Sequence, residues 1–284
     1  MEFKKNNFEM IDTHAHLHMN QFKQDFEEVI KRSSQMLFIL NVSTNLDDIE
    51  QTIQIAKRLP NTYAAIGIHP HDAKETIERE SQYLNYLESR ASTLNKVVAI
   101  GEIGLDYYRN ISPQEIQKKV FADQLLLAQD LDLPVILHIR EAYEDTYEIL
   151  KTLNNGNLRG IVHSFSSDEN WAKKFVKLGF KIGIGGPITY PKNETLRNVV
   201  KIIGRENIVT ETDCPYLPPQ PYRGKRNEPI YVSYVYEELR NILGIDISED
   251  IWKNVRELFK IDSMLKESRK RAEREMNGGV DKKC

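Results

Sequence analysis

Six residues that suit a metal site stand where apolar, strand-like runs of this chain come to an end. Imidazole nitrogens and carboxylate oxygens are common ligands of divalent metal ions. If the preceding runs are strands whose ends meet at one mouth, these side chains converge and could hold two divalent ions. The six are four histidines and two carboxylates: His14, His16, Glu102, His138, His163 and Asp213.

The pair His14 and His16 is the strongest local signal for a metal site. Side chains alternate between the two faces of a strand, so residues two positions apart point the same way. Both imidazoles can therefore face one mouth. A single histidine at a strand end, such as His138 or His163, is more often a hydrogen-bonded structural residue. Their placement at consecutive strand ends favours ligand roles for both.

The two carboxylates follow apolar strand-like runs, where an unpaired charge is costly to bury. A metal ion bridged by Glu102 would remove that cost, and a salt bridge to Arg140 or Arg109 is the alternative. Burial of Asp213 would be equally costly, and binding to a metal ion would offset that cost in the same way. Glu211 lies two positions before Asp213 and shares its face, so we expect it to support the ligands from behind.

The pattern of apolar runs predicts an α/β fold of the (β/α)₈ TIM-barrel type. Helical segments separate the strand-like runs, as in parallel βα units. Phe22, Phe26, Val29 and Ile30, for example, fall on one face of a helix. The loops after the strands of such a barrel build the active site. The predicted strands are residues 8–13, 37–42, 63–68, 97–101, 134–137, 160–162, 180–184 and 208–212.

Length and composition predict one large soluble domain. The chain has 284 residues, 40% of them hydrophobic, and a net charge of −3. We expect a barrel domain over residues 1–260 and a charged C-terminal extension over 261–284. The extension is more simply explained as a solvated helix and tail than as a segment that contacts nucleic acid. No apolar run approaches the roughly 20 residues that span a bilayer.

Cysteine content and net charge limit which cellular compartment and which partners are expected. The two cysteines, Cys214 and Cys284, form no disulfide framework and fit a reducing cytoplasm. We therefore expect a cytoplasmic protein without a membrane association, and we favour a monomer. A pI near 6.2 argues against a surface coated in positive charge. Any binding of phosphate must be local.

Several motifs, taken in order along the chain, resemble those of the TatD family of metal-dependent deoxyribonucleases, a branch of the amidohydrolase-like barrels. Two positions depart from the family pattern: His18 stands where an aspartate is common, and Ser167 where a glycine is common. Neither is a predicted ligand, so these departures concern loop detail and substrate preference. The matching segments are residues 11–17, 67–71, 101–107, 137–142, 162–165, 211–217, 223–229 and 254–259.

The resemblance implies a two-metal centre in which Glu102 bridges the ions. His14, His16 and Asp213 would hold one ion, and His138 and His163 the other. Many relatives in the wider superfamily use a carboxylated lysine as the bridge, so Glu102 favours the TatD branch. The resemblance points to Mg²⁺ in use, while the ligand set also permits Zn²⁺ or Mn²⁺.

The resemblance also suggests a reaction, the hydrolysis of phosphodiester bonds of DNA, at ends or in single strands and by an exonucleolytic mode. Two ions can lower the pKa of a shared water and neutralise charge on the attacked phosphate. Asp213 is the best general-base candidate, and Glu102 shares the catalytic centre. We expect substrate contacts from residues around the mouth: His69, Tyr107, Arg140, Arg223, Lys225 and Arg226.

The sequence leaves alternatives open for the roles of single residues and for the function of the whole protein. Arg223, Lys225 and Arg226 could be a solvated loop, and Tyr107 and Tyr108 could pack the loops around the mouth instead of stacking on bases. The protein could instead hydrolyse a small amide, lactone or phosphotriester, which would not need the basic loop. It could also be a non-enzymatic nucleic-acid-binding protein with a structural metal, which would be fully ligated and hard to remove.

Overall fold

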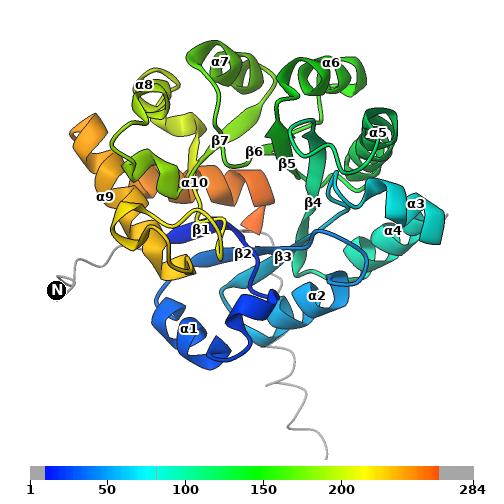
Figure 1. Cartoon of the computed structure of the whole chain (residues 1–284), viewed down its shortest axis with the longest axis horizontal. Coiled ribbons are helices and arrows are strands. Elements are labelled where there is room, and N and C mark those ends of the chain that lie inside the picture. The colour runs from blue at the N-terminus through cyan, green and yellow to red at the C-terminus, as the bar shows by residue number, and fades with distance from the viewer. Residues whose placement is uncertain (1–9, 81, 262–284) are drawn as a thin grey trace, which may run out of the picture.

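The computed structural model describes residues 10–80 and 82–261, which form a barrel of eight parallel strands. Each strand pairs with the next along the chain, and the helices lie outside the sheet (Figure 1). The predicted (β/α)₈ fold is thereby confirmed. The strands are β1 (Ile11–Ala15), β2 (Phe38–Val42), β3 (Thr62–Ile66), β4 (Val97–Asp106), β5 (Val135–Arg140), β6 (Gly160–Val162), β7 (Phe180–Ile184) and β8 (Ile208–Thr210).

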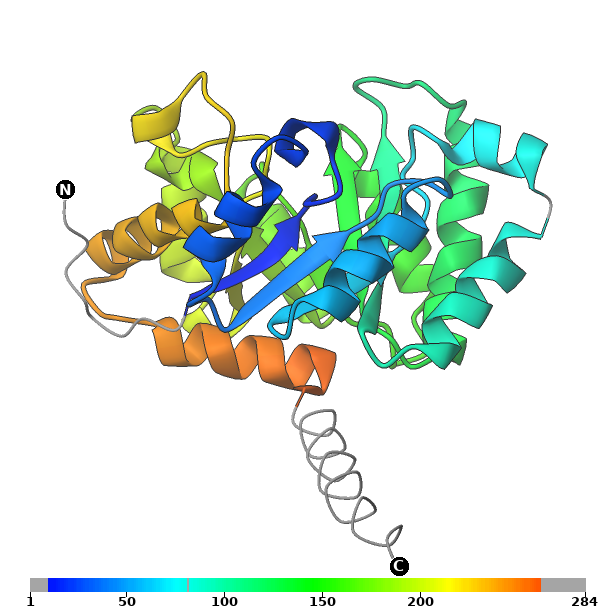
Figure 2. The same ribbon diagram turned by 90° about the horizontal axis from the view of Figure 1, so that it is seen from below.

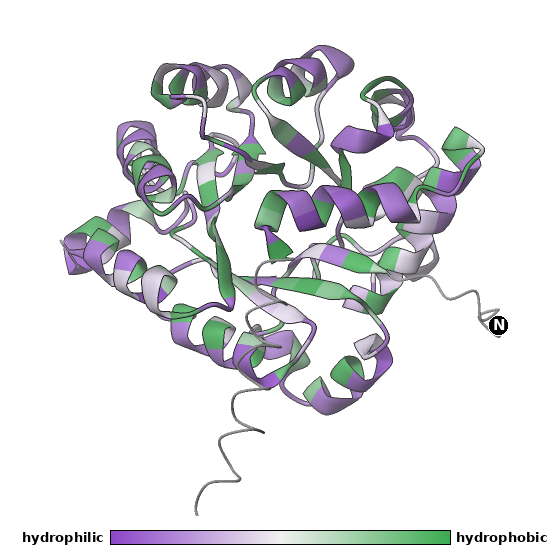
Figure 3. Ribbon diagram, turned by 180° about the vertical axis from the view of Figure 1, so that it is seen from behind, coloured by the Kyte–Doolittle hydropathy of each residue, from purple (hydrophilic) through white to green (hydrophobic). Residues whose placement is uncertain are grey.

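Amphipathic helices connect the strands and turn apolar faces to the sheet (Figure 3). In the first of them Val29 is fully buried, and Phe26 and Ile30 pack against the core, as their spacing predicts. The helices are α1 (Phe26–Ser33), α2 (Ile49–Arg58), α3 (Ala73–Arg79), α4 (Tyr83–Thr93), α5 (Gln114–Asp130), α6 (Tyr143–Leu153), α7 (Glu169–Lys177), α8 (Glu194–Ile202), α9 (Val232–Leu243) and α10 (Ser248–Phe259). Short 3₁₀ turns are η1 (Asn20–Phe22), η2 (Gly186–Thr189), η3 (Arg205–Asn207), η4 (Gln220–Tyr222) and η5 (Pro229–Tyr231).

Side chains help to close the barrel between its first and last strands. The hydroxyl of Thr210 donates to the carbonyl of Ile11 at 2.9 Å, and that of Thr13 donates to the carbonyl of Thr210 at 3.1 Å. Beyond them Ala15 and Cys214 form a single parallel bridge. The barrel is therefore nearly closed, and the segment after β8 is held against the end of β1, where two predicted ligands stand.

The amino-terminal end of the barrel is covered by α10, which lies across it (Figure 2). The Phe259 ring stacks on Phe38 at the start of β2, with ring centres 5.3 Å apart. One end of the barrel is thus sealed by apolar packing. The opposite end, where the strands finish, remains for a functional site.

The strand boundaries differ from the predicted ones mainly at β4 and β5. Both strands continue for several residues beyond their apolar runs, to Asp106 and Arg140. Glu102 and His138 therefore lie within strands rather than just beyond their ends. A strand can carry polar residues on the face that points into a site, and an apolar run alone does not reveal this.

Two predictions fall at the ends of the chain. Residues 8 and 9 of the first predicted strand, and residues 262–284 of the predicted charged extension, lie outside the described residues. Ile261, the first residue of that extension, is buried. Among the described residues, no helix has the length and apolar character needed to span a membrane.

Candidate metal centre

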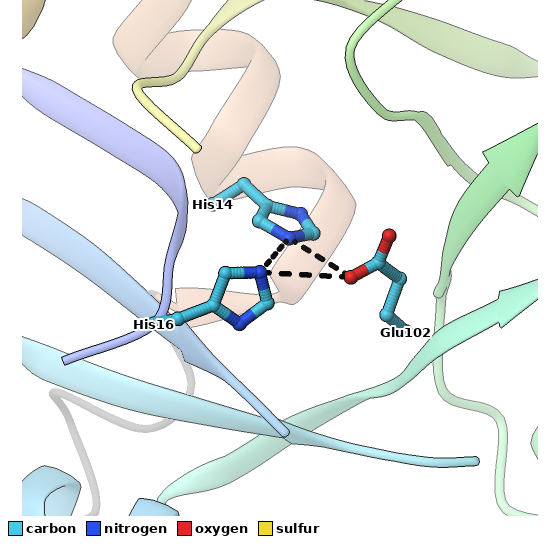
Figure 4. A group of neighbouring side chains, drawn as sticks. All are labelled: His14, His16 and Glu102. Atoms are coloured by element: carbon cyan, nitrogen blue, oxygen red, sulfur yellow. Dashed lines mark hydrogen bonds and ion pairs between the residues drawn. The ribbon is translucent and has the colours of Figure 1, made fainter. Parts of the chain in front are cut away.

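His14, in β1, and His16, just after it, turn their imidazoles towards Glu102 of β4 (Figure 4). The two Nε2 atoms are 3.1 Å apart, and both side chains are buried. The pairing of β1 with β2 shifts register between Asp12 and Ala15, around His14. Irregularities of this kind re-aim side chains and are frequent beside active sites.

The two carboxylate oxygens of Glu102 face different groups of histidines. Oε2 lies 3.3 Å from His14 Nε2 and 3.7 Å from His16 Nε2 (Figure 4). Oε1 faces three other nitrogens: His138 Nδ1 at 2.9 Å, His69 Nε2 at 3.7 Å and His163 Nε2 at 3.8 Å. The pairing of β4 with β5 also shifts register here, between Ile100 and Ile103. The alternative partners, Arg109 and Arg140, make no ion pair with Glu102 among the described residues.

Asp213 lies three residues beyond β8 and completes the group on the His14 side. Its Oδ1 is 3.5 Å from His16 Nε2, 3.8 Å from His163 Nε2 and 3.9 Å from His14 Nε2. Its backbone N–H donates to the His14 carbonyl at 2.9 Å, through the contact that closes the barrel. The side chain is 14% exposed, more than that of Glu102, so it borders the open mouth.

Three of the histidines are oriented from behind by oxygen atoms. His16 Nδ1 donates to the Val42 carbonyl at 2.8 Å, which leaves Nε2 free to bind a metal. His138 Nε2 is 3.0 Å from Asp106 Oδ2, which leaves Nδ1 for the centre. His163 Nδ1 is 3.0 Å from Glu211 Oε1, so its Nε2 points inward. These partners select the ring nitrogen that each histidine offers.

His69 differs from these three histidines because its protonated nitrogen is the one that faces Glu102. The backbone N–H of His71 donates to His69 Nδ1 at 3.1 Å, so Nδ1 carries a lone pair. Burial and nearby His138 lower the pKa of His69 well below its usual value, so the ring is neutral. A neutral ring with Nδ1 unprotonated carries its proton on Nε2. His69 can share a site with Glu102 and His138 by distance, but this tautomer makes it a hydrogen-bond donor into the mouth.

The charges of the centre favour ionised carboxylates. Burial raises the pKa of Glu102, but nearby His14 and the contact with His138 outweigh it and hold that pKa well below its usual value. Burial likewise raises the pKa of Asp213, and His163 and His16 outweigh it, so the net shift is downward. Both groups are thus anionic oxygen donors at neutral pH.

The residues present fit a divalent metal centre. Three buried atoms behind the ring nitrogens that face Glu102 have no hydrogen-bond partner in the described structure: His14 Nδ1, His163 Nδ1 and Glu211 Oε2, whose residues form a further group close enough to hold an ion. Histidine and carboxylate atoms from five strands or strand ends lie within 4 Å of their neighbours, in two groups joined by Glu102. Bound cations would neutralise the buried negative charge of the carboxylates. They would also accept the lone pairs of histidine nitrogens that otherwise face one another across the centre.

Comparison with known proteins assigns the chain to a family. The model of the family described as TatD related DNase matches residues 11–260. The chain belongs to the TatD family. A relative in Bacillus subtilis, YabD, named an uncharacterized metal-dependent hydrolase, is 39% identical over 258 residues, 89% of this chain and 100% of YabD.

Solved structures of the TatD family share the fold closely. The TatD homologue YjjV from Escherichia coli superposes with a TM-score of 0.82 at 31% identity, covering 89% of this chain and 99% of YjjV. A TatD family hydrolase from Entamoeba histolytica gives 0.78 at 26% identity, covering 88% and 98%. The resemblance found in the sequence is confirmed, and the chain is a TatD family metal-dependent hydrolase.

The residues predicted to contact substrate divide into two groups in this TatD protein. His69, Arg140, Arg223 and Lys225 are placed where a ligand could reach them: His69 beside Glu102, and the other three exposed. The Arg140 guanidinium lies 3.9 Å from the ring centre of Tyr108, and that of Arg223 lies 4.3 Å from that of Tyr190. Stacking of this kind leaves guanidinium N–H groups available for phosphate.

Tyr107 and Arg226 are engaged elsewhere. The Tyr107 hydroxyl donates to Asp145 at 2.7 Å. The Arg226 guanidinium donates to both oxygens of Asp25 at 2.7 Å and to Glu228 at 2.9 Å. It also covers the ring of Phe22. Arg226 therefore ties the loop after β8 to the start of α1, and its charge is already matched by two carboxylates.

Two residues that sequence reasoning missed stand close to the centre. Asp106 lies on β4 four positions after Glu102, and its Oδ2 contacts His138 and also His71, at 2.9 Å. The even spacing from Glu102 was the available signal, but the predicted strand ended too early to use it. Gly183 of β7 is the second, because a Cβ there would meet Glu211 Oε2 at 2.4 Å. A side chain at this position would displace Glu211.

Proposed function

We propose that this protein is a deoxyribonuclease that hydrolyses phosphodiester bonds at DNA ends or in single strands, with two divalent ions bound. The observation that carries the proposal is that the two carboxylate oxygens of Glu102 face different histidines. Oε2 faces His14 and His16, and Oε1 faces His138 and His163. A carboxylate in that position can bridge two cations. Two-metal sites are common in enzymes that cleave phosphate esters.

The roles of the side chains follow from their positions. His14, His16 and Asp213 would hold one ion, His138 and His163 the other, and Glu102 both. Bound divalent ions supply a water of lowered pKa and neutralise charge on the phosphate. Mg²⁺ is the proposed ion in use, and Zn²⁺ or Mn²⁺ also suits this donor set.

Asp213 is the proposed general base. Its side chain is the more exposed of the two central carboxylates, at 14% against 5% for Glu102. The lowered pKa keeps it ionised and able to accept a proton from the attacking water. Glu102 faces five histidine nitrogens, which fits a bridging role rather than proton transfer.

Donors around the mouth suit a phosphate backbone. His69 Nε2–H points to the region of Glu102, where a phosphate oxygen would lie, and the neutral ring can donate without competing for a metal. Arg140, Arg223 and Lys225 add exposed positive charge at the carboxyl ends of β5 and β8. This local positive charge favours a polyanion over a neutral amide or lactone. Arg226, matched by Asp25 and Glu228, takes no part in this proposal.

The proposal is tested by stripping the purified chain with a chelator and restoring Mg²⁺, Mn²⁺ or Zn²⁺. Substrates are end-labelled single- and double-stranded DNA, RNA, and small amides, lactones and phosphotriesters. We expect metal-dependent release of nucleotides from DNA, abolished by the chelator and recovered on adding metal, with up to two ions per chain. Asp213→Asn, loaded in the same way, controls for a contaminating nuclease.

Two other results would each replace the proposal. Hydrolysis of a small substrate with no action on DNA would indicate an amidohydrolase-like enzyme. Binding of nucleic acid by a protein that holds its metal against the chelator and hydrolyses nothing would indicate a structural metal. Full DNA cleavage by a sample that elemental analysis shows to be free of metal would rule out the two-metal mechanism.

A further inference from the structure

Tyr216 presents an exposed aromatic ring directly beside the candidate metal centre. The residue is 46% exposed, whereas neighbouring His16 is 3% exposed. The centres of the two rings are 6.3 Å apart, with the planes inclined at 68°. The ring thus stands at the mouth of the barrel, beside the candidate ligands His16 and Asp213.

The backbone under this ring is firmly held. The N–H of Tyr216 donates to the carbonyl of Asp213 at 2.8 Å. Asn227, fully buried, donates its side-chain amide to the carbonyls of Tyr216 and Thr212 at 2.7 and 2.8 Å. Its own N–H donates to the Pro215 carbonyl at 3.0 Å. The turn that carries Asp213 therefore also fixes where the Tyr216 ring projects.

Other tyrosines in this region have a structural task that accounts for their positions. Tyr222 and Tyr231 stack on each other with ring centres 4.0 Å apart. The buried Tyr236 accepts a hydrogen bond from the Ile11 N–H through its hydroxyl. The Tyr216 hydroxyl meets the side chain of Gln21, yet its ring is almost half exposed above a fixed backbone. A rigid aromatic face beside a reaction centre is well suited to contact an apolar, planar part of a substrate.

We propose that Tyr216 stacks on the nucleobase of the nucleotide next to the scissile phosphate, an inference that rests on the proposed deoxyribonuclease function. Every base has a π-face, so such a contact tolerates any sequence. Within a duplex both faces of a base are covered by its neighbours. Stacking on Tyr216 therefore requires an unpaired base, and the substrate class that follows is a single strand or a frayed end. Tyr216 acts as a positioning and specificity residue.

The test compares Tyr216→Ala, Tyr216→Phe and Tyr216→Trp on two single-stranded oligonucleotides. One carries a normal base beside the cleaved bond, and the other carries an abasic analogue there. Alanine should raise KM for the normal oligonucleotide by about 5- to 150-fold, the range for one lost base–aromatic stack. It should change KM for the abasic one by less than about twofold. Phe and Trp should keep KM near that of the parent.

Tyr86→Ala is the control, because that tyrosine lies on α4 and its hydroxyl contacts Glu50 on the outside of the barrel. Metal content and melting temperature are measured for every variant. Should Tyr216→Ala lose metal, Tyr216→Leu replaces it, since leucine keeps an apolar side chain without a π-face. An equal rise of KM on both oligonucleotides, or no rise on either, overturns the stacking proposal. A parent protein that neither cleaves nor binds DNA overturns the proposed function itself, and the two failures are thus distinguishable.

Discussion

Glu211 and His163 face each other inside the barrel, with Oε1 of the carboxylate 3.0 Å from Nδ1 of the imidazole. The same oxygen accepts the backbone N–H of Ser164 at 2.6 Å, so it is anchored to the end of β6. The contact is an ion pair without the alignment of a hydrogen bond, since Nδ1 has no hydrogen-bond partner. Gly183 leaves the space that Glu211 occupies. Glu211 thus orients His163 without reaching the centre of the mouth.

Replacing Glu211 with glutamine should weaken metal binding more than it weakens catalysis. Partners of metal-ligating histidines typically contribute about 10- to 100-fold to metal affinity. We expect a loss of that order in a competition with a chromogenic chelator, and turnover within a few-fold of the parent at saturating metal. Glu148→Gln, on the outer face of α6, is the matched control. An unchanged affinity would contradict the role that we assign to Glu211.

Asp213→Asn should show the opposite behaviour. Asparagine keeps the shape and can ligate through its carbonyl oxygen, but it accepts no proton from water. We expect turnover at saturating metal to fall by roughly 10² to 10⁴, as for a removed general base. The ion beside His138 and Glu102 should remain, as measured by elemental analysis. Near-normal turnover here, with collapse in Glu211→Gln, would reverse the assignment of the two carboxylates.

The basic residues after β8 should separate into one that stabilises the loop and two that act on DNA. Arg226→Ala removes hydrogen bonds to Asp25 and Glu228, but Arg32 still pairs with both carboxylates, so we expect it to cost about 0.5 to 1.5 kcal/mol of unfolding free energy. For a domain of this size, each kcal/mol lowers the melting temperature by roughly 2 to 4 °C.

Arg223→Ala and Lys225→Ala, by contrast, should leave the melting temperature nearly unchanged and weaken DNA binding. In a plot of the logarithm of DNA affinity against the logarithm of salt concentration, each lost phosphate contact should reduce the slope by about one unit. A measurement of DNA affinity at several salt concentrations checks this. Loss of salt dependence in Arg226→Ala, at unchanged stability, would assign the phosphate contact to Arg226 instead.

Metal binding should release protons because His163 must give one up. Burial lowers the pKa of His163, but Glu211 and Asp213 outweigh it and raise the pKa in the metal-free protein to about 10, from 6.5. Protonated His163 therefore stabilises the folded, metal-free protein. This contribution is fully present below pH 6.5 and is lost as the pH rises through about 10. The metal-free protein should therefore lose stability over that window, and its metal affinity should rise. Calorimetric titration in two buffers of different ionisation enthalpy should detect proton release at pH 7, and a release of zero would contradict the assignment.

The sequence by itself determined the barrel and the members of the centre. Period-two spacing places His14 and His16 on one face of a strand, and this depends only on local backbone geometry. The apolar runs mark eight strands because parallel strands covered by helices are buried on both faces. Strand ends of such a barrel meet at one mouth. The convergence of Glu102, His138 and His163 follows from these rules without knowledge of any contact.

Only the tertiary structure decided which polar groups are committed and which are free. Arg226 is matched by Asp25 from a segment some two hundred positions earlier, and Tyr107 by Asp145 from the next βα unit. The extension of β4 to Asp106, the partner of His138, depends on pairing with β5. The tautomer of His69 depends on a turn that brings the His71 N–H to its ring. Pairings between distant segments, and hydrogen bonds set by the exact path of a loop, leave no periodic trace in a sequence.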